Sequence, residues 1–301
     1  MNLSLKSFLP PLDLGWNHVR ARCDVPTCHS KLLTRAVPHS RTGIRMGQRW
    51  YCSPDCFVAG VVAPLGTLSR GRMMEMPRNP RLSLGLAMLS RGHLTQDQLR
   101  FAMDQSLRGE PLETTLIRLG LANDKKLAAA RAAQWGYPVL GHDSAGLLVK
   151  VDLPGTFLTA FAAVPLHYAP AAKRLLLGFV HHVDHSLLQS IEQITGCRAE
   201  PCFMTPAEFD AQKERVIAVP DYEEVVVEEP GTRAQMARTL GGFAAEIAAQ
   251  EANLVRSKSW IWSRLAGKRR TVDVLFALKD TAETARDLET SDSRETVSTP
   301  A

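Results

Sequence analysis

Two stretches of the chain repeat one pattern of apolar and polar positions. The first is LSLGLAMLSRGHLTQDQLRFAM, residues 82–103, and the second is PLETTLIRLGLANDKKLAAARA, residues 111–132. In each, apolar residues recur every three or four positions, a glycine follows, and a capping residue (Thr95 or Asn123) precedes a second helical segment. Matched positions lie 28 residues apart. The pattern therefore predicts a duplicated helix pair with a packed apolar core.

The apolar period changes after the second repeat. Short runs rich in β-forming residues predict three strands: 162–169, 174–180 and 197–204. Amphipathic segments predict two helices beside them: 185–196 and 205–216. Helices set against one side of a small sheet make residues 81–216 an α+β unit.

A second, smaller α+β unit is expected at residues 231–278. The helical segment AQMARTLGGFAAEIAAQ is followed there by two strand-like segments, VRSKSWIWSRL and TVDVLFAL. Trp260 and Trp262 alternate onto one face of the first strand, so we expect them to pack beneath the preceding helix. The remaining segments connect or extend these units: linkers at 66–80 and 217–230 and a disordered tail at 279–301.

Residues 1–65 contain four of the six cysteines, in the close pairs Cys23/Cys28 and Cys52/Cys56. Two such pairs separated by a loop suit a tetrahedral thiolate site. The second pair spans the predicted start of a helix, where the helix dipole favours a thiolate. The spacing predicts one structural zinc ion in a module that resembles a treble clef or zinc ribbon. Buried free thiols and a redox pair are the alternatives.

Composition and charge restrict the function classes. Hydrophobic residues make up 45% of the chain and charged residues 22%, as in soluble globular proteins. No apolar run approaches the roughly 20 residues of a membrane helix, and no secretory signal is recognisable, so we expect a cytoplasmic protein. The net charge is +5, with basic residues enriched in the first 80 positions. This charge, the cysteines and Trp260/Trp262 before Lys-Arg-Arg leave a nucleic-acid-binding zinc protein as one alternative.

The duplicated segment resembles a known domain. The order of elements over 81–216, the WGYPVL after the second repeat and the closing TGCRAEPCFMTPAEFDA are similar to the N-terminal domain of type II secretion and type IV pilus ATPases, the GspE N-terminal or MshEN domain. The resemblance implies a docking or regulatory domain of a secretion or pilus machine. Some members of that family bind cyclic di-GMP through the tandem motif, each copy of which begins Arg-Leu-Gly.

This chain departs from the nucleotide-binding motif at several positions. Ser83 and Pro111 stand where the motif has arginine, and Glu113 replaces a glycine with a carboxylate that would repel phosphate. Arg81 substitutes for an arginine only with a shift in register. The ligand-binding set implied by the resemblance is Arg81, Leu84, Gly85, Gly92, Leu112, Gly120 and Gln134. A packed helical core that binds no nucleotide accounts for the same leucine spacing.

No ATPase motif accompanies the domain. The P-loop pattern G-x-x-x-x-G-K-[ST] is absent from the sequence, and no catalytic arrangement can be assigned. The sequence therefore predicts a bacterial, non-enzymatic interaction or regulatory protein. Its expected partner is a protein component of secretion or pilus assembly, without membrane insertion. The alternatives are a cyclic di-GMP sensor and a nucleic-acid-binding zinc protein.

Overall fold

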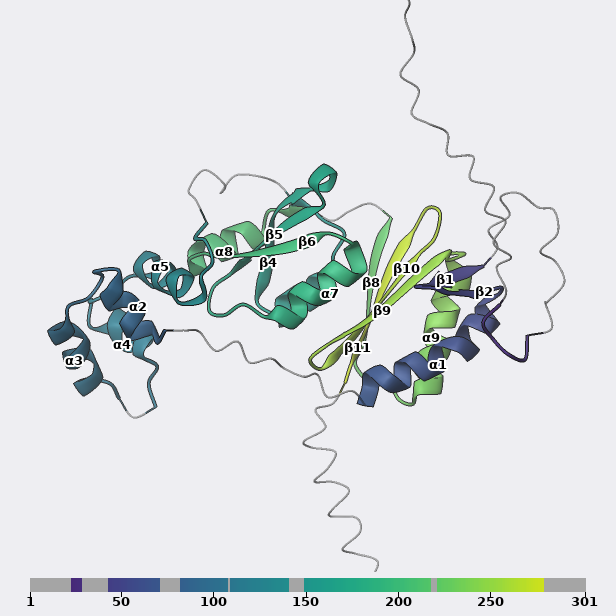
Figure 1. The fold of residues 1–301 in the computed structure, drawn as a ribbon, viewed down its shortest axis with the longest axis horizontal. Helices are drawn as coiled ribbons and strands as arrows, with labels where there is room; N and C mark the ends of the chain where they lie inside the picture. The colour runs from purple at the N-terminus through teal and green to yellow at the C-terminus, as the bar shows by residue number, and fades with distance from the viewer. Residues whose placement is uncertain are drawn as a thin grey trace, which may run out of the picture.

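The computed structural model describes residues 23–28, 43–70, 82–107, 109–140, 149–217 and 221–278. They form a helical unit, a small α/β unit and a six-stranded sheet with two helices, which follow one another across Figure 1. Helices and strands are both abundant, so the α+β fold class predicted from the sequence is confirmed. Within these ranges, no helix combines the length and the apolar character needed to cross a bilayer.

The helical unit contains the predicted duplication. Its helices are α2 (Leu84–Ser90), α3 (Gln96–Asp104), α4 (Leu112–Arg118) and α5 (Asp124–Trp135). Helices α2 and α4 have seven residues each and start 28 positions apart. Thr95 caps α3 and Asn123 caps α5 at the same offset. Each copy contributes apolar side chains to one core, including Ala87, Met88, Ala102, Leu116, Leu127 and Ala130. The repeated pattern thus sets both the helix boundaries and the packing.

The α/β unit is built on a three-stranded sheet. Its strands are β4 (Ala163–Ala169), β5 (Arg174–Phe179) and β6 (Arg198–Phe203), with β4 antiparallel and β6 parallel to the central β5. Its helices are α6 (Gly155–Ala160), α7 (His185–Thr195) and α8 (Pro206–Lys213). A two-residue parallel pair, β3 (Val149–Lys150) with β7 (Val216–Ile217), closes the unit. A 3₁₀ turn, η2 (Pro170–Ala172), joins β4 to β5. The three strands and two helices expected from the sequence are all present.

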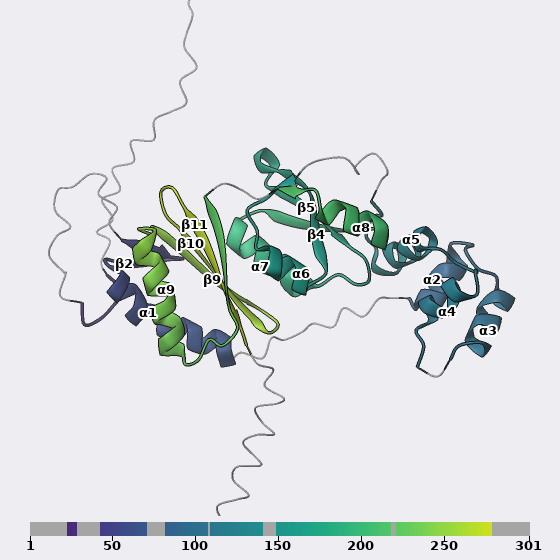
Figure 2. The same ribbon diagram turned by 180° about the vertical axis from the view of Figure 1, so that it is seen from behind.

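The six-stranded sheet has the order β2-β1-β9-β10-β11-β8. Its strands are β1 (Ile44–Met46), β2 (Arg49–Tyr51), β8 (Tyr222–Val227), β9 (Glu251–Ser257), β10 (Trp260–Ala266) and β11 (Thr271–Ala277). Strands β9 to β11 form an antiparallel meander, whereas β1 and β8 pair in parallel on its two sides. Helices α1 (Pro54–Arg70) and α9 (Arg233–Glu246) lie side by side on one face of the sheet (Figures 1 and 2).

The N-terminal strands do not form a separate module. Strand β1 pairs with β9 through Arg45 and Glu251, so residues predicted to belong to the 1–65 and 231–278 units share one sheet. They also share one core, in which Phe57 of α1 and Leu240 of α9 are fully buried. A hairpin of two three-residue strands buries too little apolar surface to stand alone, and the larger sheet covers it.

Two predicted linkers contain regular structure. Helix α1 runs on to Arg70, inside the expected 66–80 linker, because Leu65 and Leu68 still pack on the sheet core. Strand β8 lies inside the expected 217–230 linker, and its Val225 and Val227 pack on the same core. The glutamates that flank those valines concealed the strand in the sequence. Most of 66–80 and the whole 279–301 tail lie outside the described residues.

The tryptophans of β10 face away from α9, contrary to the sequence expectation. Ile261 and Leu265 point to the α1/α9 face, whereas Trp262 lies on the opposite face by strand alternation. There Trp262 is fully buried beside Phe157 of α6, with ring centroids 5.0 Å apart. The sheet is therefore covered on both faces, and its second face joins the core of the α/β unit, where α6 and α7 lie (Figure 2).

Asp184 fastens α7 to the turn between β9 and β10. Its carboxylate caps α7 by accepting from the N–H groups of Ser186 and Leu187, and it lies 2.5 Å from the Lys258 ammonium. Burial opposes ionisation of this carboxyl, but Lys258 and Ser186 outweigh the burial and hold its pKa below the ordinary value. A depressed folded-state pKa contributes stability that is present above the unfolded pKa and is lost as the pH falls through the folded pKa.

We expect Asp184→Asn to lower the free energy of unfolding at pH 7, with the deficit shrinking as the pH falls below about 4. Urea unfolding of both proteins at pH 7, 4 and 2.5 measures this convergence. Asp97→Asn, at an aspartate whose side chain is 95% exposed, is the control and should give no deficit at any pH. A deficit for Asp184→Asn that stays constant down to pH 2.5 would contradict the assignment.

Candidate functional site

Four cysteines are brought together by a turn, a hairpin and a helix start. Cys23 and Cys28 bracket a turn that is closed by a hydrogen bond from the Cys28 N–H to the Val25 carbonyl, 3.0 Å. Cys52 directly follows β2, and Cys56 lies in the first turn of α1. The turn is held on β2 by two hydrogen bonds between Asp24 and Trp50, of 2.7 and 3.0 Å. The Cys56 N–H donates to Ser53 Oγ at 3.2 Å, which caps α1.

The sulfur geometry fits one metal ion. All four Sγ atoms lie within 4.8 Å of one another. The Cys28–Cys52 and Cys52–Cys56 sulfur pairs are 3.5 and 3.6 Å apart. A tetrahedral zinc with Zn–S bonds of about 2.3 Å places its sulfurs about 3.8 Å from one another, whereas a disulfide requires about 2.05 Å. The donor set is that of a four-cysteine site, and all four cysteines are partly buried.

Without a cation the cluster favours protonated thiols. Burial raises the pKa of the Cys52 thiol, and burial raises the pKa of Cys56 to about 12. The Cys23 and Cys28 thiols raise both pKa values further, whereas a hydrogen bond with Ser53 lowers that of Cys56 and one with Cys56 lowers that of Cys52. The helix N-terminus, from which we expected a thiolate at Cys56, does not overcome this environment. A bound divalent cation supplies the charge that four adjacent thiolates need.

The other metal-binding residue types do not assemble in this way. Cys197 and Cys202 are buried near opposite ends of β6, and burial raises the pKa of Cys202 to about 12. His181 and His182 lie in the turn before α7, and neither joins a group of potential metal ligands. Across the described ranges, the four-cysteine cluster is the group of three or more ligand side chains that converges on one point.

The glycines of the repeat serve packing and helix ends. Gly85 is buried, and a side chain there would meet Leu99 and Leu112 at 3.2 to 3.5 Å, so the glycine allows α2 to approach its neighbours. Gly92 and Gly120 adopt φ values of +66° and +67°, which end α2 and α4 in the left-handed conformation. The C-terminal ends of α2 and α4 have the same hydrogen bond. The His93 N–H donates to the Met88 carbonyl, and the Leu121 N–H donates to the Leu116 carbonyl.

Glu113 is half-buried and pairs with a buried arginine. Its carboxylate forms an ion pair with Arg131, which is 7% exposed and also donates to the Val180 carbonyl at 2.9 Å. His181 Nδ1 lies 3.9 Å from the same carboxylate, and burial followed by the Arg131 charge lowers its pKa. This contact joins the helical unit to the α/β unit. Arg131 was not among the residues predicted from the sequence, although a single arginine within an alanine-rich helix was a signal that it has a buried partner.

The other described members of the implied ligand set are bonded or packed within the protein. The Gln134 side chain donates to the Leu82 carbonyl at 2.8 Å. Leu84 and Leu112 are half-buried against the repeat core. Arg81 lies outside the described residues. The described residues of the implied ligand set therefore contact other residues of the helical unit itself.

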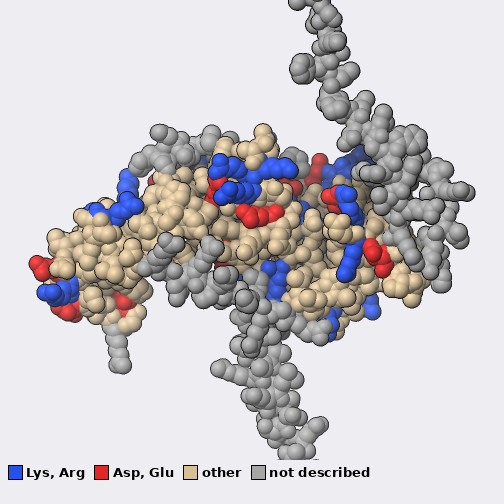
Figure 3. All heavy atoms as spheres, viewed as in Figure 1, with Lys and Arg blue, Asp and Glu red and all other residues tan. Residues whose placement is uncertain are grey.

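Large apolar side chains remain exposed on this unit. Their exposed fractions run from 48% to 65%, and they are Leu86, Phe101, Met103, Leu107 and Ile117. In Figure 3 the charged side chains visible over the helical unit lie at its outer tip and along its upper and lower edges, and the surface between them carries none. Several exposed apolar residues on one small unit are typical of a surface that contacts another protein.

No family model matches the chain. Over 129 residues it is 26% identical to the type IV pilus assembly ATPase PilB of Thermus thermophilus, which covers 42% of this chain but only 14% of PilB. Two solved structures are also similar. "Structure of MshE with cdg" is 20% identical with a TM-score of 0.38, covering 46% of this chain and 100% of that one. The N-terminal domain of XpsE is 24% identical with a TM-score of 0.33, covering 44% and 92%. The resemblance to type IV pilus ATPases expected from the repeat is confirmed by the PilB similarity.

Proposed function

We propose that this chain is a non-enzymatic docking protein related to the N-terminal domains of type II secretion and pilus ATPases. The observation that carries the proposal is the combination found in the helical unit. Its apolar side chains are exposed at Phe101, Met103 and neighbouring positions, while Glu113 and Gln134 are bonded within the protein. A surface of this kind binds a protein through apolar contacts rather than an anionic nucleotide through charge.

The four-cysteine cluster supports a structural role for one zinc ion. Cys23, Cys28, Cys52 and Cys56 would fill all four positions of a tetrahedral site, which leaves none for a substrate. The cluster joins the N-terminal turn to β2 and α1, whose side chains enter the core of the six-stranded sheet. The metal would therefore stabilise the sheet on which α1 and α9 pack.

The expected partner is a component of a secretion or pilus assembly. The chain spans about one seventh of the PilB relative's length, so the partner class rests on the resemblance of one domain. Glu113 argues against cyclic di-GMP, because its carboxylate occupies a glycine position of the motif and Arg131 already neutralises it. An approaching phosphate would have to compete with that ion pair.

We expect the purified chain to bind a purified cytoplasmic segment of a secretion or pilus assembly protein from the same host. The double variant Phe101→Ser/Met103→Ser should weaken binding at least about tenfold, because it removes exposed apolar anchors. Biolayer interferometry measures the affinities, and circular dichroism checks the fold. Val226→Ser is the matched control, since Val226 is an exposed apolar residue on β8, outside the helical unit.

Two other measurements test the alternative functions, a cyclic di-GMP sensor and a nucleic-acid-binding protein. Calorimetry with cyclic di-GMP should show no binding, and micromolar binding that is lost in Arg81→Ala would favour a sensor. Binding to random RNA or DNA with a steep salt dependence would favour a nucleic-acid-binding protein. Equal partner binding by wild type and the double variant would remove the helical unit from the interface.

A further inference from the structure

The edge of strand β9 is only partly covered. Strand β1 pairs with it through the single register position Arg45–Glu251. Within the described ranges, no other strand pairs with β9 on that side, while β10 pairs along its whole length on the other. The stretch from Asn253 onward is therefore a sheet edge in the described part of the protein. An edge of this kind is a template for another strand.

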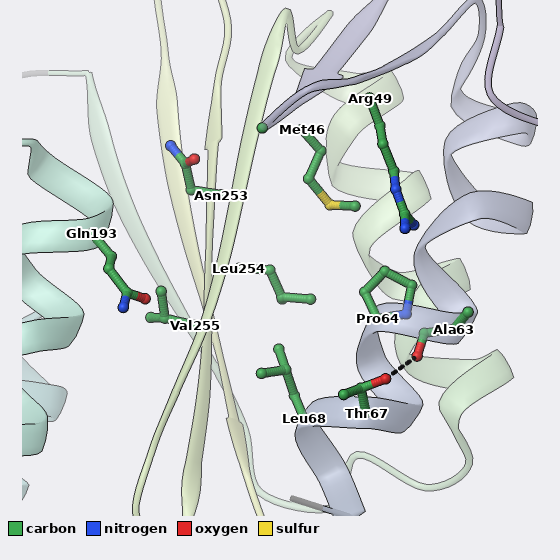
Figure 4. Close-up of a pocket in the computed structure, with 11 residues that line it drawn as sticks. Met46, Arg49, Ala63, Pro64, Thr67, Leu68, Gln193, Asn253, Leu254 and Val255 are labelled. Atoms are coloured by element: carbon green, nitrogen blue, oxygen red, sulfur yellow. Dashed lines mark hydrogen bonds between the residues drawn. The ribbon is translucent and has the colours of Figure 1, made fainter.

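A groove of about 540 Å³ follows this edge. Figure 4 shows β9 between two walls, with Pro64 and Leu68 of α1 on one side and Gln193 of α7 on the other. Leu254 points toward α1 and Val255 toward α7. The β1–β2 turn closes one end of the groove, where Met46 and Arg49 lie. The full lining is Met46, Gly47, Arg49, Ala63, Pro64, Thr67, Leu68, Gln193, Asn253, Leu254 and Val255.

The backbone of β9 presents hydrogen-bonding groups to this groove. A two-residue turn at Lys258–Ser259 joins β9 to β10 and makes Ser257 and Trp260 a directly opposed pair. Hydrogen-bonded pairs of an antiparallel ladder alternate along the strand, so the odd-numbered residues of β9 face β10. The N–H and C=O groups of Leu254 then face the groove. An added strand would bond to them without disturbing the existing sheet.

The opposite edge of the sheet is protected in a way that this one is not. Strand β8 carries Glu223, Glu224 and the adjacent Glu228, and charged side chains on an edge strand prevent pairing with other chains. The lining of the β9 groove contains no carboxylate, and its charged side chain is Arg49 at the closed end. The groove is therefore open to a strand and attracts negative charge at one end.

We propose that this groove binds an extended peptide segment of a partner protein by strand addition to β9. The segment carries apolar side chains at alternate positions, which pack on Leu254, Pro64 and Leu68, and polar ones that face Gln193. Antiparallel addition places its C-terminal end at the β1–β2 turn, where an acidic residue meets Arg49. This site lies on the six-stranded sheet and is independent of the docking proposed for the helical unit.

The probe is a fluorescein-labelled peptide, Thr-Val-Thr-Val-Thr-Asp, added to the 301-residue chain in the presence of zinc. A second labelled peptide, which ends in Lys instead of Asp, is the probe of reversed charge. We expect saturable binding in fluorescence polarisation. Arg49→Glu should weaken binding about tenfold and shift preference to the peptide that ends in Lys. This exchange of charges tests contact at the closed end, because a structural defect in the variant would not improve binding of the Lys peptide.

Two further variants test the strand contact. Leu254→Pro removes an N–H that faces the groove and not β10, so it should abolish binding. Thr67→Trp fills the groove from α1 and should also abolish peptide binding. It keeps the test valid if the proline variant does not fold. Thr239→Trp on α9 is the matched control, because both threonines bond the carbonyl four residues earlier and Thr239 lies outside the groove.

Each outcome decides the proposal. Binding that is lost in Thr67→Trp, kept in Thr239→Trp and reversed in charge preference by Arg49→Glu supports it. Three results overturn it. The first is that neither peptide binds. The second is peptide binding that Arg49→Glu and Thr67→Trp leave unaffected. The third is concentration-dependent self-association that these two variants abolish, because a second copy of the chain then occupies the groove.

Discussion

Replacing Cys52 with serine is expected to remove one zinc ion per chain and to lower the melting temperature more than any other single change in the N-terminal part. Cys52 is central to the cluster, since its sulfur lies 3.5 Å from that of Cys28 and 3.6 Å from that of Cys56. Structural zinc contributes apparent binding free energies of about 10 to 16 kcal/mol in small domains. This free energy is as large as the whole net stability of a typical domain, which is about 5 to 15 kcal/mol.

The loss should propagate into the sheet. Tyr51 and Phe57 flank the cluster and are fully buried, with ring centroids 5.7 Å apart. If the turn and hairpin detach, these side chains leave the core beneath α9. We therefore expect amide hydrogen exchange to rise in β1, β2 and the first turns of α1, and to stay slow in the helical unit.

Metal analysis by plasma mass spectrometry and thermal unfolding measure both effects. Cys197→Ser is the control, because it removes a buried thiol outside the cluster and should leave the metal content unchanged. Wild-type protein that contains no metal after purification without chelators, yet has the same melting temperature with and without added zinc, would contradict the site.

Local patterns in the sequence were sufficient for the repeat and for the cysteines. Thr95, Asn123, Gly92 and Gly120 fix helix ends through their own caps and φ angles, so the boundaries of α2 to α5 follow from a few neighbouring residues. Two closely spaced cysteine pairs likewise converge because each pair lies on one tight local structure. The zinc itself and the nucleotide set, including Arg81, stay predictions.

Contacts between distant residues could not be predicted in this way. Arg45 and Glu251 are 206 positions apart, and nothing in a three-residue strand specifies which sheet it joins. The same is true of the ion pair between Glu113 and Arg131, which turns an expected phosphate-repelling group into an internal bond. The choice of face for Trp262 depended on which helix covers which side, and alternation alone leaves both sides equivalent.

The second large effect is expected at a buried ion pair in the C-terminal sheet. Asp273 is fully buried and accepts from Arg264 at 2.6 and 2.9 Å and from the Tyr222 hydroxyl at 3.0 Å. Burial and the Asp273 charge raise the pKa of Tyr222, which keeps its hydroxyl protonated as a donor. Arg264 is 11% exposed and also donates to the Asp152 carbonyl, so it joins the sheet to the segment before α6.

We expect Asp273→Asn to lower the free energy of unfolding by about 3 to 5 kcal/mol, because it leaves the Arg264 guanidinium buried without its main counter-charge. The double variant Arg264→Met/Asp273→Leu should recover most of that loss, since neither charge then remains to be desolvated. Urea unfolding of the three proteins at pH 7 measures the cycle. A double variant less stable than Asp273→Asn would mean that the hydrogen bonds of the pair, rather than the unpaired charge, dominate at this site. In that case Asp152 and Tyr222, which lose their contacts to Arg264 and Asp273 in the double variant, would carry the cost.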